Sequence, residues 1–112
     1  MARIEQTADG VTVRLATWEK IAGLRGDIQI PRSAVTAVQV ENEPLAAVAG
    51  VRAPGLHVPG RIKIGTWRHS GSKTFAAARR GVSAVRLDLA GQRYSRLVIS
   101  VDDAAGTADA LR

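Results

Sequence analysis

Side chains that could carry acid–base or nucleophilic chemistry are few and far apart in this sequence. Ser70 and Lys73 have the Ser-x-x-Lys spacing of some acyl-transfer enzymes, in which the pair lies at the start of a helix. Here the spacing covers Ser70-Gly71-Ser72, a turn signal between two strand patterns. The lysine would therefore not lie one helical turn from the serine, and the spacing gives no support to catalysis.

The sequence also lacks a recognisable metal or cofactor motif. His57 and His69 have no carboxylate within five residues, and the chain has no cysteine, whereas zinc sites gather three or four ligands. Asp102 and Asp103 directly precede an alanine-rich helical pattern and are interpreted as its N-cap and first turn. No P-loop, dinucleotide-binding or nucleophile-elbow motif occurs at usable spacing. We therefore predict that the protein is not an enzyme, and we expect no cofactor and no metal site.

The charge of +6 is unevenly distributed along the chain. Residues 51–100 carry ten basic and one acidic side chain (+9), whereas residues 1–50 carry five basic and six acidic ones (−1). Thirteen of the sixteen bases are arginine, whose planar fork suits phosphate and carboxylate groups. The positive charge of residues 51–100 favours an acidic protein, an anionic membrane surface or nucleic acid as the partner. The alternative is compositional, because GC-rich bacterial genomes encode arginine-rich proteins.

The candidate binding residues lie in and beside a strand pattern over residues 61–68. Its isoleucines are expected to face the core, and its basic and aromatic side chains the other way. A tryptophan in a basic groove can stack on single-stranded nucleic acid, but packing beneath arginine side chains is the favoured interpretation, and no specific nucleic acid is expected. We assign a binding role to Arg52, His57, Arg61, Lys63, Trp67, Arg68 and His69.

Two Pro-Gly pairs, Pro54-Gly55 and Pro59-Gly60, precede that strand. Pro-Gly is typical of a type II turn, with glycine at positive φ in the third position. The sequence predicts two tight turns in an ordered structural loop, with positive φ at both glycines. The loop is either a rigid crossover between sheets, which is favoured, or a binding loop.

Alternating apolar residues predict strands over most of the chain. The last four are expected to form an antiparallel meander, because turn signals recur every 8–12 residues. Thr17 is predicted to cap a short helix that ends at Gly23, with Trp18 filling the core. A final helix is predicted to dock through Ala104, Ala105, Ala108 and Leu111. The predicted strands cover residues 2–7, 11–15, 27–30, 35–40, 61–68, 73–79, 82–89 and 93–101.

This order of seven or eight strands followed by one helix resembles the pleckstrin-homology-like (PH-like) fold. The stretches WEKIAGLRGDIQIP, GVRAPG, PGRIKIGTWR and YSRLVISVDDAAGTADAL resemble small PH-like domain proteins of actinobacteria. The resemblance implies one mainly β domain over residues 1–112, a barrel or sandwich of antiparallel strands capped by a C-terminal helix. PH domains that bind phosphoinositides have a basic first hairpin loop; here it is Ala8-Asp9-Gly10, so inositol-lipid binding is not implied.

These observations predict a non-catalytic interaction module that binds an acidic protein or peptide, or a second copy of itself. Open strand edges suit such binding, because a partner can add a strand there. The alternative is peripheral binding to anionic lipid or nucleic acid through residues 51–100. No apolar run approaches the roughly 20 residues that span a bilayer, and residues 1–10 lack an apolar signal segment, so we expect a soluble cytoplasmic protein.

Overall fold

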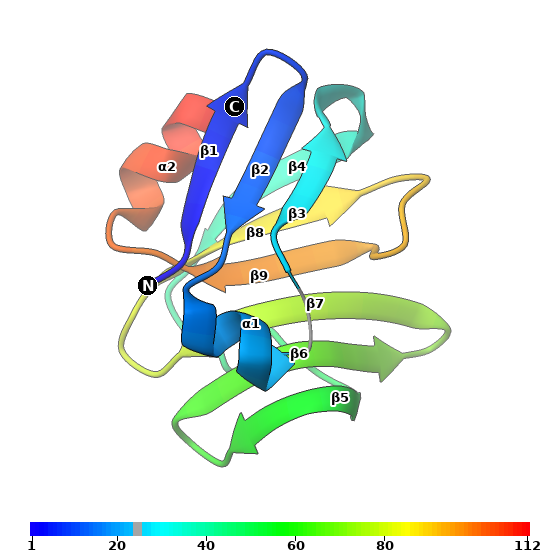
Figure 1. The fold of residues 1–112 in the computed structure, drawn as a ribbon, viewed down its shortest axis with the longest axis vertical. Coiled ribbons are helices and arrows are strands. Elements are labelled where there is room, and N and C mark those ends of the chain that lie inside the picture. Colours follow the sequence, from blue (N-terminus) through cyan, green and yellow to red (C-terminus); the bar gives the residue numbers. More distant parts are fainter. Residues whose placement is uncertain (24–25) are drawn as a thin grey trace.

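In a computed structural model, residues 1–23 and 26–112 are described, except for the side chains of residues 23 and 51–54. The described residues form nine strands in two sheets, two α-helices and one 3-10 helix (Figure 1). In chain order these are β1 (Arg3–Thr7), β2 (Gly10–Arg14), α1 (Thr17–Gly23), β3 (Ile28–Pro31), η1 (Arg32–Ala34), β4 (Val35–Glu41), β5 (Val51–Val58), β6 (Ile62–His69), β7 (Ser72–Arg79), β8 (Ala84–Leu89), β9 (Arg96–Ser100) and α2 (Ala104–Leu111).

The two sheets pack face to face around the main core. The smaller sheet has the order β1-β2-β3, and its strands cross over the larger sheet, whose order is β4-β8-β9-β7-β6-β5 (Figure 1). The prediction of a mainly β domain with a C-terminal helix is confirmed, but the described strands form no closed barrel. The most completely buried core side chains come from both sheets and from α2: Val11, Val13, Ile28, Phe75, Val85, Leu87, Leu97, Ile99 and Leu111.

The predicted four-stranded antiparallel meander is wrong in one connection. β6 and β7 pair through a turn at the predicted place, which is one residue shorter than Ser70-Gly71-Ser72: Ser70 (φ 51°) and Gly71 (φ 81°) form it, and Ser72 pairs with His69. β8 does not pair with β7, because β9 lies between them, antiparallel to β8 and parallel to β7. This insertion places Phe75 opposite Leu97, and both side chains are buried in the main core.

Local turn and strand patterns are confirmed in the smaller sheet. Thr7 pairs with Gly10 across the predicted first hairpin turn. β2 pairs with β3, so that Val13 and Ile28 are directly opposite and buried. These side chains alternate with polar ones on the outer face, as period-two sequences require.

α1 differs from its predicted orientation. Thr17 is the first helical residue, and the carboxylate of Glu19 accepts a hydrogen bond from the backbone N–H of Ala16 at 2.8 Å. Glu19 is only 1% exposed, whereas Trp18 is 39% and Ile21 71% exposed. The prediction that Trp18 fills the core is therefore wrong, because this short helix turns its capping carboxylate, and not its tryptophan, toward the interior.

α2 docks as predicted, through a narrower face. Asp103 is its N-cap, accepting a hydrogen bond from the N–H of Gly106 at 3.0 Å. Ala104, Ala108 and Leu111 are buried, and Ala105 is exposed. The helix packs against β4, β8 and β1 and closes one side of the core (Figure 1).

The two Pro-Gly pairs have different structures. Pro59-Gly60 forms the predicted turn, in which the N–H of Arg61 donates to the carbonyl of Val58 at 2.9 Å. The Pro54-Gly55 pair instead lies inside β5, where the pairing with β6 shifts register, so the first predicted turn is wrong. Proline is tolerated there because β5 is an edge strand. Positive φ is confirmed at Gly55 (148°) and Gly60 (73°).

Candidate binding surfaces

The outer face of the larger sheet holds a second, smaller core. Lys63 and Trp67 share this face, as predicted, but Trp67 is only 2% exposed. The segment over residues 43–49 covers the Trp67 side chain, so the indole is not available to stack on a ligand. The buried residues of this second core are Val48, Trp67, Ala76, Ala78, Ala84 and Val98.

Lys63 fastens the covering segment to the sheet. Its Nζ donates hydrogen bonds to the carbonyls of Leu45 at 3.0 Å and Val48 at 2.6 Å. The covering segment forms a run of turns, in which the N–H of Val48 donates to the carbonyl of Leu45 at 3.4 Å. Burial lowers the pKa of the Lys63 amine. Lys63 is therefore a structural residue and not a free cation of a binding face.

The position of Lys63 predicts how stability responds to alkaline pH. Because its folded-state pKa lies below the ordinary value of 10.5, the unfolded chain binds more protons than the folded chain between those two values. The free energy of unfolding contributed by this group therefore rises with pH across that interval. Lys63→Met should remove this rise, which urea unfolding of both proteins from neutral pH to 10.5 measures. Parallel pH profiles for the two proteins would contradict the assignment.

The remaining predicted residues do not assemble into one site. His57 is half-buried, with its ring edge-on to Trp67 at a centroid separation of 6.1 Å. Arg61 is exposed at one end of β6, and Arg68 and His69 are exposed at the other. The side chain of Arg52 lies outside the described residues; its backbone pairs with Trp67.

An exposed apolar surface lies where α1 meets the larger sheet. Three of the four exposed large apolar side chains among the described residues are Trp18, Ile21 and Val58, and α1 packs against β5 and β6. The Arg79 guanidinium lies 4.4 Å from the centroid of the Trp18 ring. Arg79 is opposite Ile62, which is opposite Val58. We call these five residues the α1–β5 surface.

The α1–β5 surface is bordered by basic side chains and by a free strand edge. Arg61 and Arg80 are exposed beside it, and the N–H of Arg80 donates to the carbonyl of Arg61 at 2.8 Å. Within the described part of the chain, neither arginine forms an ion pair. β5 ends the larger sheet and pairs only with β6 among the described strands. Trp18 was the sequence signal for this surface, but it was interpreted as part of the core.

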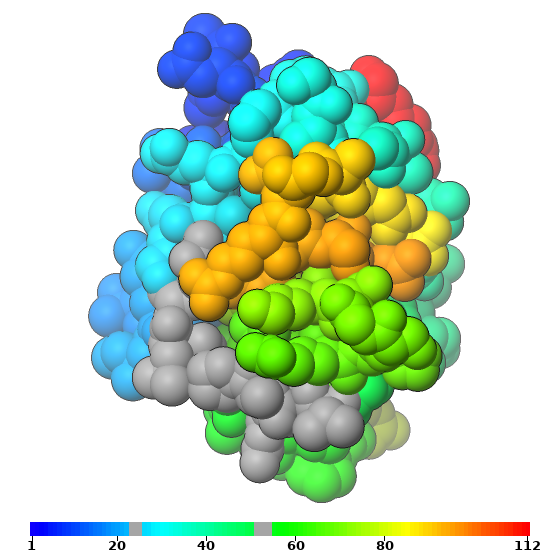
Figure 2. All heavy atoms as spheres, turned by 90° about the vertical axis from the view of Figure 1, so that its right-hand side faces the viewer, coloured from blue at the N-terminus to red at the C-terminus, as the bar shows by residue number. Residues whose placement is uncertain are grey.

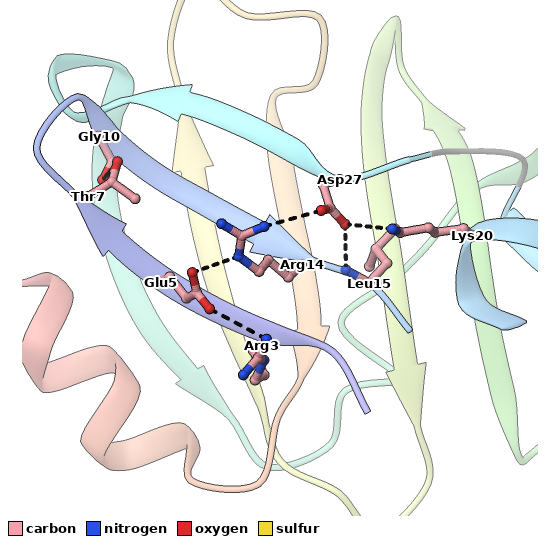
Figure 3. Close-up of polar contacts among 8 residues, drawn as sticks. All are labelled: Arg3, Glu5, Thr7, Gly10, Arg14, Leu15, Lys20 and Asp27. Atoms are coloured by element: carbon pink, nitrogen blue, oxygen red, sulfur yellow. Dashed lines mark hydrogen bonds and ion pairs between the residues drawn. The ribbon is translucent and has the colours of Figure 1, made fainter. Parts of the chain in front are cut away.

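The outer face of the smaller sheet carries a ladder of compensated charges (Figure 3). Glu5 accepts from Arg14 Nε at 2.6 Å, and Asp27 lies 3.6 Å from Arg14 and 3.5 Å from Lys20. The hydrogen bond from Arg14 lowers the pKa of Glu5, and the one from the Leu15 N–H lowers the pKa of Asp27. The ladder links β1, β2 and α1. Each charge of the ladder has a neighbour of opposite sign, so most of the charge on this face is compensated.

The residues described in the structure contain no group of three His, Cys, Asp or Glu side chains placed to hold a metal ion. Over the same residues, no helix has the length and apolar character needed to cross a bilayer.

Comparison with known proteins finds no matching family model, no matching curated protein and no matching solved structure. The resemblance to PH-like domain proteins therefore stays a prediction.

Proposed function

We propose that the protein is a non-catalytic interaction module of PH-like type that binds an extended, acidic segment of a protein partner along β5. The observation that carries the proposal is the exposed α1–β5 surface beside a free strand edge. Exposed apolar groups that gather beside a polar rim are typical of protein-binding surfaces. Tryptophan and arginine, here Trp18 and Arg79, are the residue types most often found at the energetic centre of interfaces.

The geometry suits strand addition of limited length. A partner strand gains hydrogen bonds from the edge backbone and specificity from its alternate side chains. Pro54 lacks an N–H and the pairing is irregular up to Gly55, so residues 55–58 form the regular part of the edge. A site of four residues supports weak, reversible binding, which the apolar contacts on α1 would strengthen. Arg61 and Arg80 would attract acidic residues of the partner.

A display library of random linear peptides provides the test. We expect selected peptides to be acidic with alternating apolar residues, and to shift the backbone amide resonances of residues 55–58. Ile21→Asp should abolish their binding without lowering the melting temperature, because Ile21 is 71% exposed. Gln39→Asp, which adds the same charge at an exposed position of β4, is the matched control. Peptides that bind the Ile21 variant as well as the wild type would refute the proposal.

Self-association, and binding to anionic lipid or nucleic acid, would give different experimental results. A second copy pairing through β5 would appear as a concentration-dependent mass in analytical ultracentrifugation, and a strict monomer at high concentration excludes it. Peripheral binding to anionic lipid or nucleic acid would weaken steeply with salt, because it depends on counterion release. Binding of the selected peptides that persists in high salt would identify the apolar contacts as the main source of affinity.

A further inference from the structure

The turn between β6 and β7 and the loop between β8 and β9 are joined at one end of the larger sheet. The N–H and hydroxyl of Ser95 both donate to the carbonyl of Lys73, at 2.8 and 3.1 Å. The N–H of Leu89 donates to the carbonyl of Ser95 at 2.9 Å, which closes the second loop. Figure 2 shows the two segments, light green and orange, in contact across the surface. The backbones of these two segments are therefore held in fixed relative positions.

A groove of about 450 Å³ opens on the outer face of the larger sheet at this end. Its floor is a row of three side chains from adjacent strands, because Arg96 of β9 is opposite Thr74 of β7 and opposite Asp88 of β8. Further lining residues come from residues 43–49, from the end of the β6–β7 pair and from the second loop: Ala47, Ala49, His69, Ser72 and Ser95. Strand pairing therefore places the floor of the groove, and the two joined segments form part of its wall.

The charges at the groove compensate one another. Asp88 Oδ1 accepts a hydrogen bond from Arg96 Nε at 2.8 Å and lies 3.7 Å from Arg86 Nε. Arg86 pairs in turn with Glu41 at 2.8 Å, so the two arginines and two carboxylates of this network have no net charge. An anion in the groove would be repelled by Asp88 and a cation by Arg96, and like-charge contacts are costly. The groove therefore favours a neutral ligand over an ion of either sign.

The groove also presents hydrogen-bonding groups that the described residues leave unused. The terminal nitrogens of Arg96, Oδ2 of Asp88 and the hydroxyls of Ser72 and Thr74 have no hydrogen-bond partner among those residues. The Arg96 and Asp88 side chains are 39% and 26% exposed, so a ligand can reach both. A guanidinium only donates and a carboxylate only accepts. Their mutual hydrogen bond keeps free donors and a free acceptor next to each other.

We propose that this groove binds a neutral carbohydrate through two adjacent hydroxyl groups of a sugar ring. A hydroxyl both donates and accepts, so one ring hydroxyl accepts from Arg96 while its neighbour donates to Asp88. The Thr74 hydroxyl provides a further hydrogen bond, and the methyl groups of Ala47 and Ala49 provide an apolar wall for the C–H groups of the ring. The volume lies in the range of small-molecule sites. The site shares no residue with the α1–β5 surface and goes beyond the proposed function.

Titration of ¹⁵N-labelled protein with the methyl glycosides of glucose, mannose and galactose tests the site. With at least one of them we expect saturable shifts of the amide resonances of Ser72, Thr74 and Ser95 and of the Arg96 Nε–H. Added sodium chloride should leave the affinity unchanged, because salt screens interactions between net charges. Inorganic phosphate, an anion, and glycine, a zwitterion that would align with the Asp88–Arg96 pair, are the charged references. Binding of either reference without binding of any glycoside, or no saturable shift with any of these probes, would overturn the proposal.

Variants of the floor residues test the assigned contacts. Arg96→Lys keeps a positive charge beside Asp88 but removes the planar fork, and it should weaken glycoside affinity roughly tenfold or more. Thr74→Val keeps the side-chain volume, removes one hydroxyl and should weaken the affinity roughly two- to tenfold. Thr107→Val, on α2, is the matched control and should leave the affinity unchanged.

The Thr74 variant also guards against misfolding. If Arg96→Lys fails to fold, a folded Thr74→Val protein that binds the glycosides as tightly as Thr107→Val would still contradict the proposal. Because none of these variants changes the α1–β5 surface, failure here leaves the peptide-binding proposal to its own test.

Discussion

Replacing Trp67 by alanine is expected to lower the free energy of unfolding by about 3–5 kcal/mol. Trp67 is 2% exposed and is the largest side chain of the second core, whose other buried members are alanines and valines. Trp18→Ala is the matched control, with an expected loss below about 1 kcal/mol because Trp18 is 39% exposed. Urea denaturation followed by circular dichroism measures both values without depending on tryptophan emission.

Because these are the two tryptophans of the chain, fluorescence provides a second readout. Trp18→Phe should leave a blue-shifted emission from buried Trp67, and Trp67→Phe should leave the red-shifted emission of a solvated indole. Equal destabilisation by the two alanine variants, or a red-shifted emission from Trp67, would mean that residues 43–49 do not cover the sheet.

Replacing Gly55 by alanine is expected to destabilise the protein by about 2–4 kcal/mol, because overpacking adds to backbone strain. An added Cβ at Gly55 would lie 2.3 Å from the carbonyl oxygen of Ile64 and 2.7 Å from the Cα of Gly65. Both atoms belong to the β6 backbone, which cannot move without separating the strands. Gly60→Ala should lose only about 1 kcal/mol, since nothing lies within 4 Å of its Cβ position.

Both glycines have positive φ, but Gly60 (73°) lies close to the left-handed region that other residues can enter, whereas Gly55 (148°) lies where glycine alone is common. The comparison therefore measures the steric contact together with this additional backbone strain. Chemical denaturation of the two variants gives the difference directly, and the amide resonances of Ile64 and Gly65 report where the backbone moves. A Gly55 variant as stable as the Gly60 variant would show that β5 and β6 are farther apart than the structure places them.

Local sequence patterns predicted the faces of the strands well. Val11 and Val13 alternate with polar residues and are buried, and Pro59-Gly60 turns where its dihedral preferences require. These features depend on neighbouring residues alone. The insertion of β9 between β8 and β7 depends on pairing between distant segments. β8 alternates along its sequence, whereas β7 and β9 hold consecutive buried residues, a pattern that indicates burial on both faces but names no neighbour. Their sequences therefore do not specify which neighbour each strand selects.

The roles of the two tryptophans show why the candidate surface was harder to predict. Trp18 was assigned to the core but is 39% exposed, whereas Trp67, placed on a binding face with packing favoured over stacking on a ligand, is 2% exposed. The hydrophobicity of a side chain predicts that its burial is favourable. Whether a given face of a sheet is covered depends on a segment elsewhere in the chain. Residues 43–49 provide that cover for Trp67, and Lys63, assigned to binding because of its charge, anchors them.

The central position of β9 has a consequence for the order in which the chain acquires its structure. β9 follows eight other strands in the sequence, yet it alone connects the β4–β8 pair to the β7–β6–β5 group. During synthesis from the N-terminus, the larger sheet therefore stays in two halves until residues 96–100 leave the ribosome. Until then the facing edges of β7 and β8 are unpaired and open to intermolecular association.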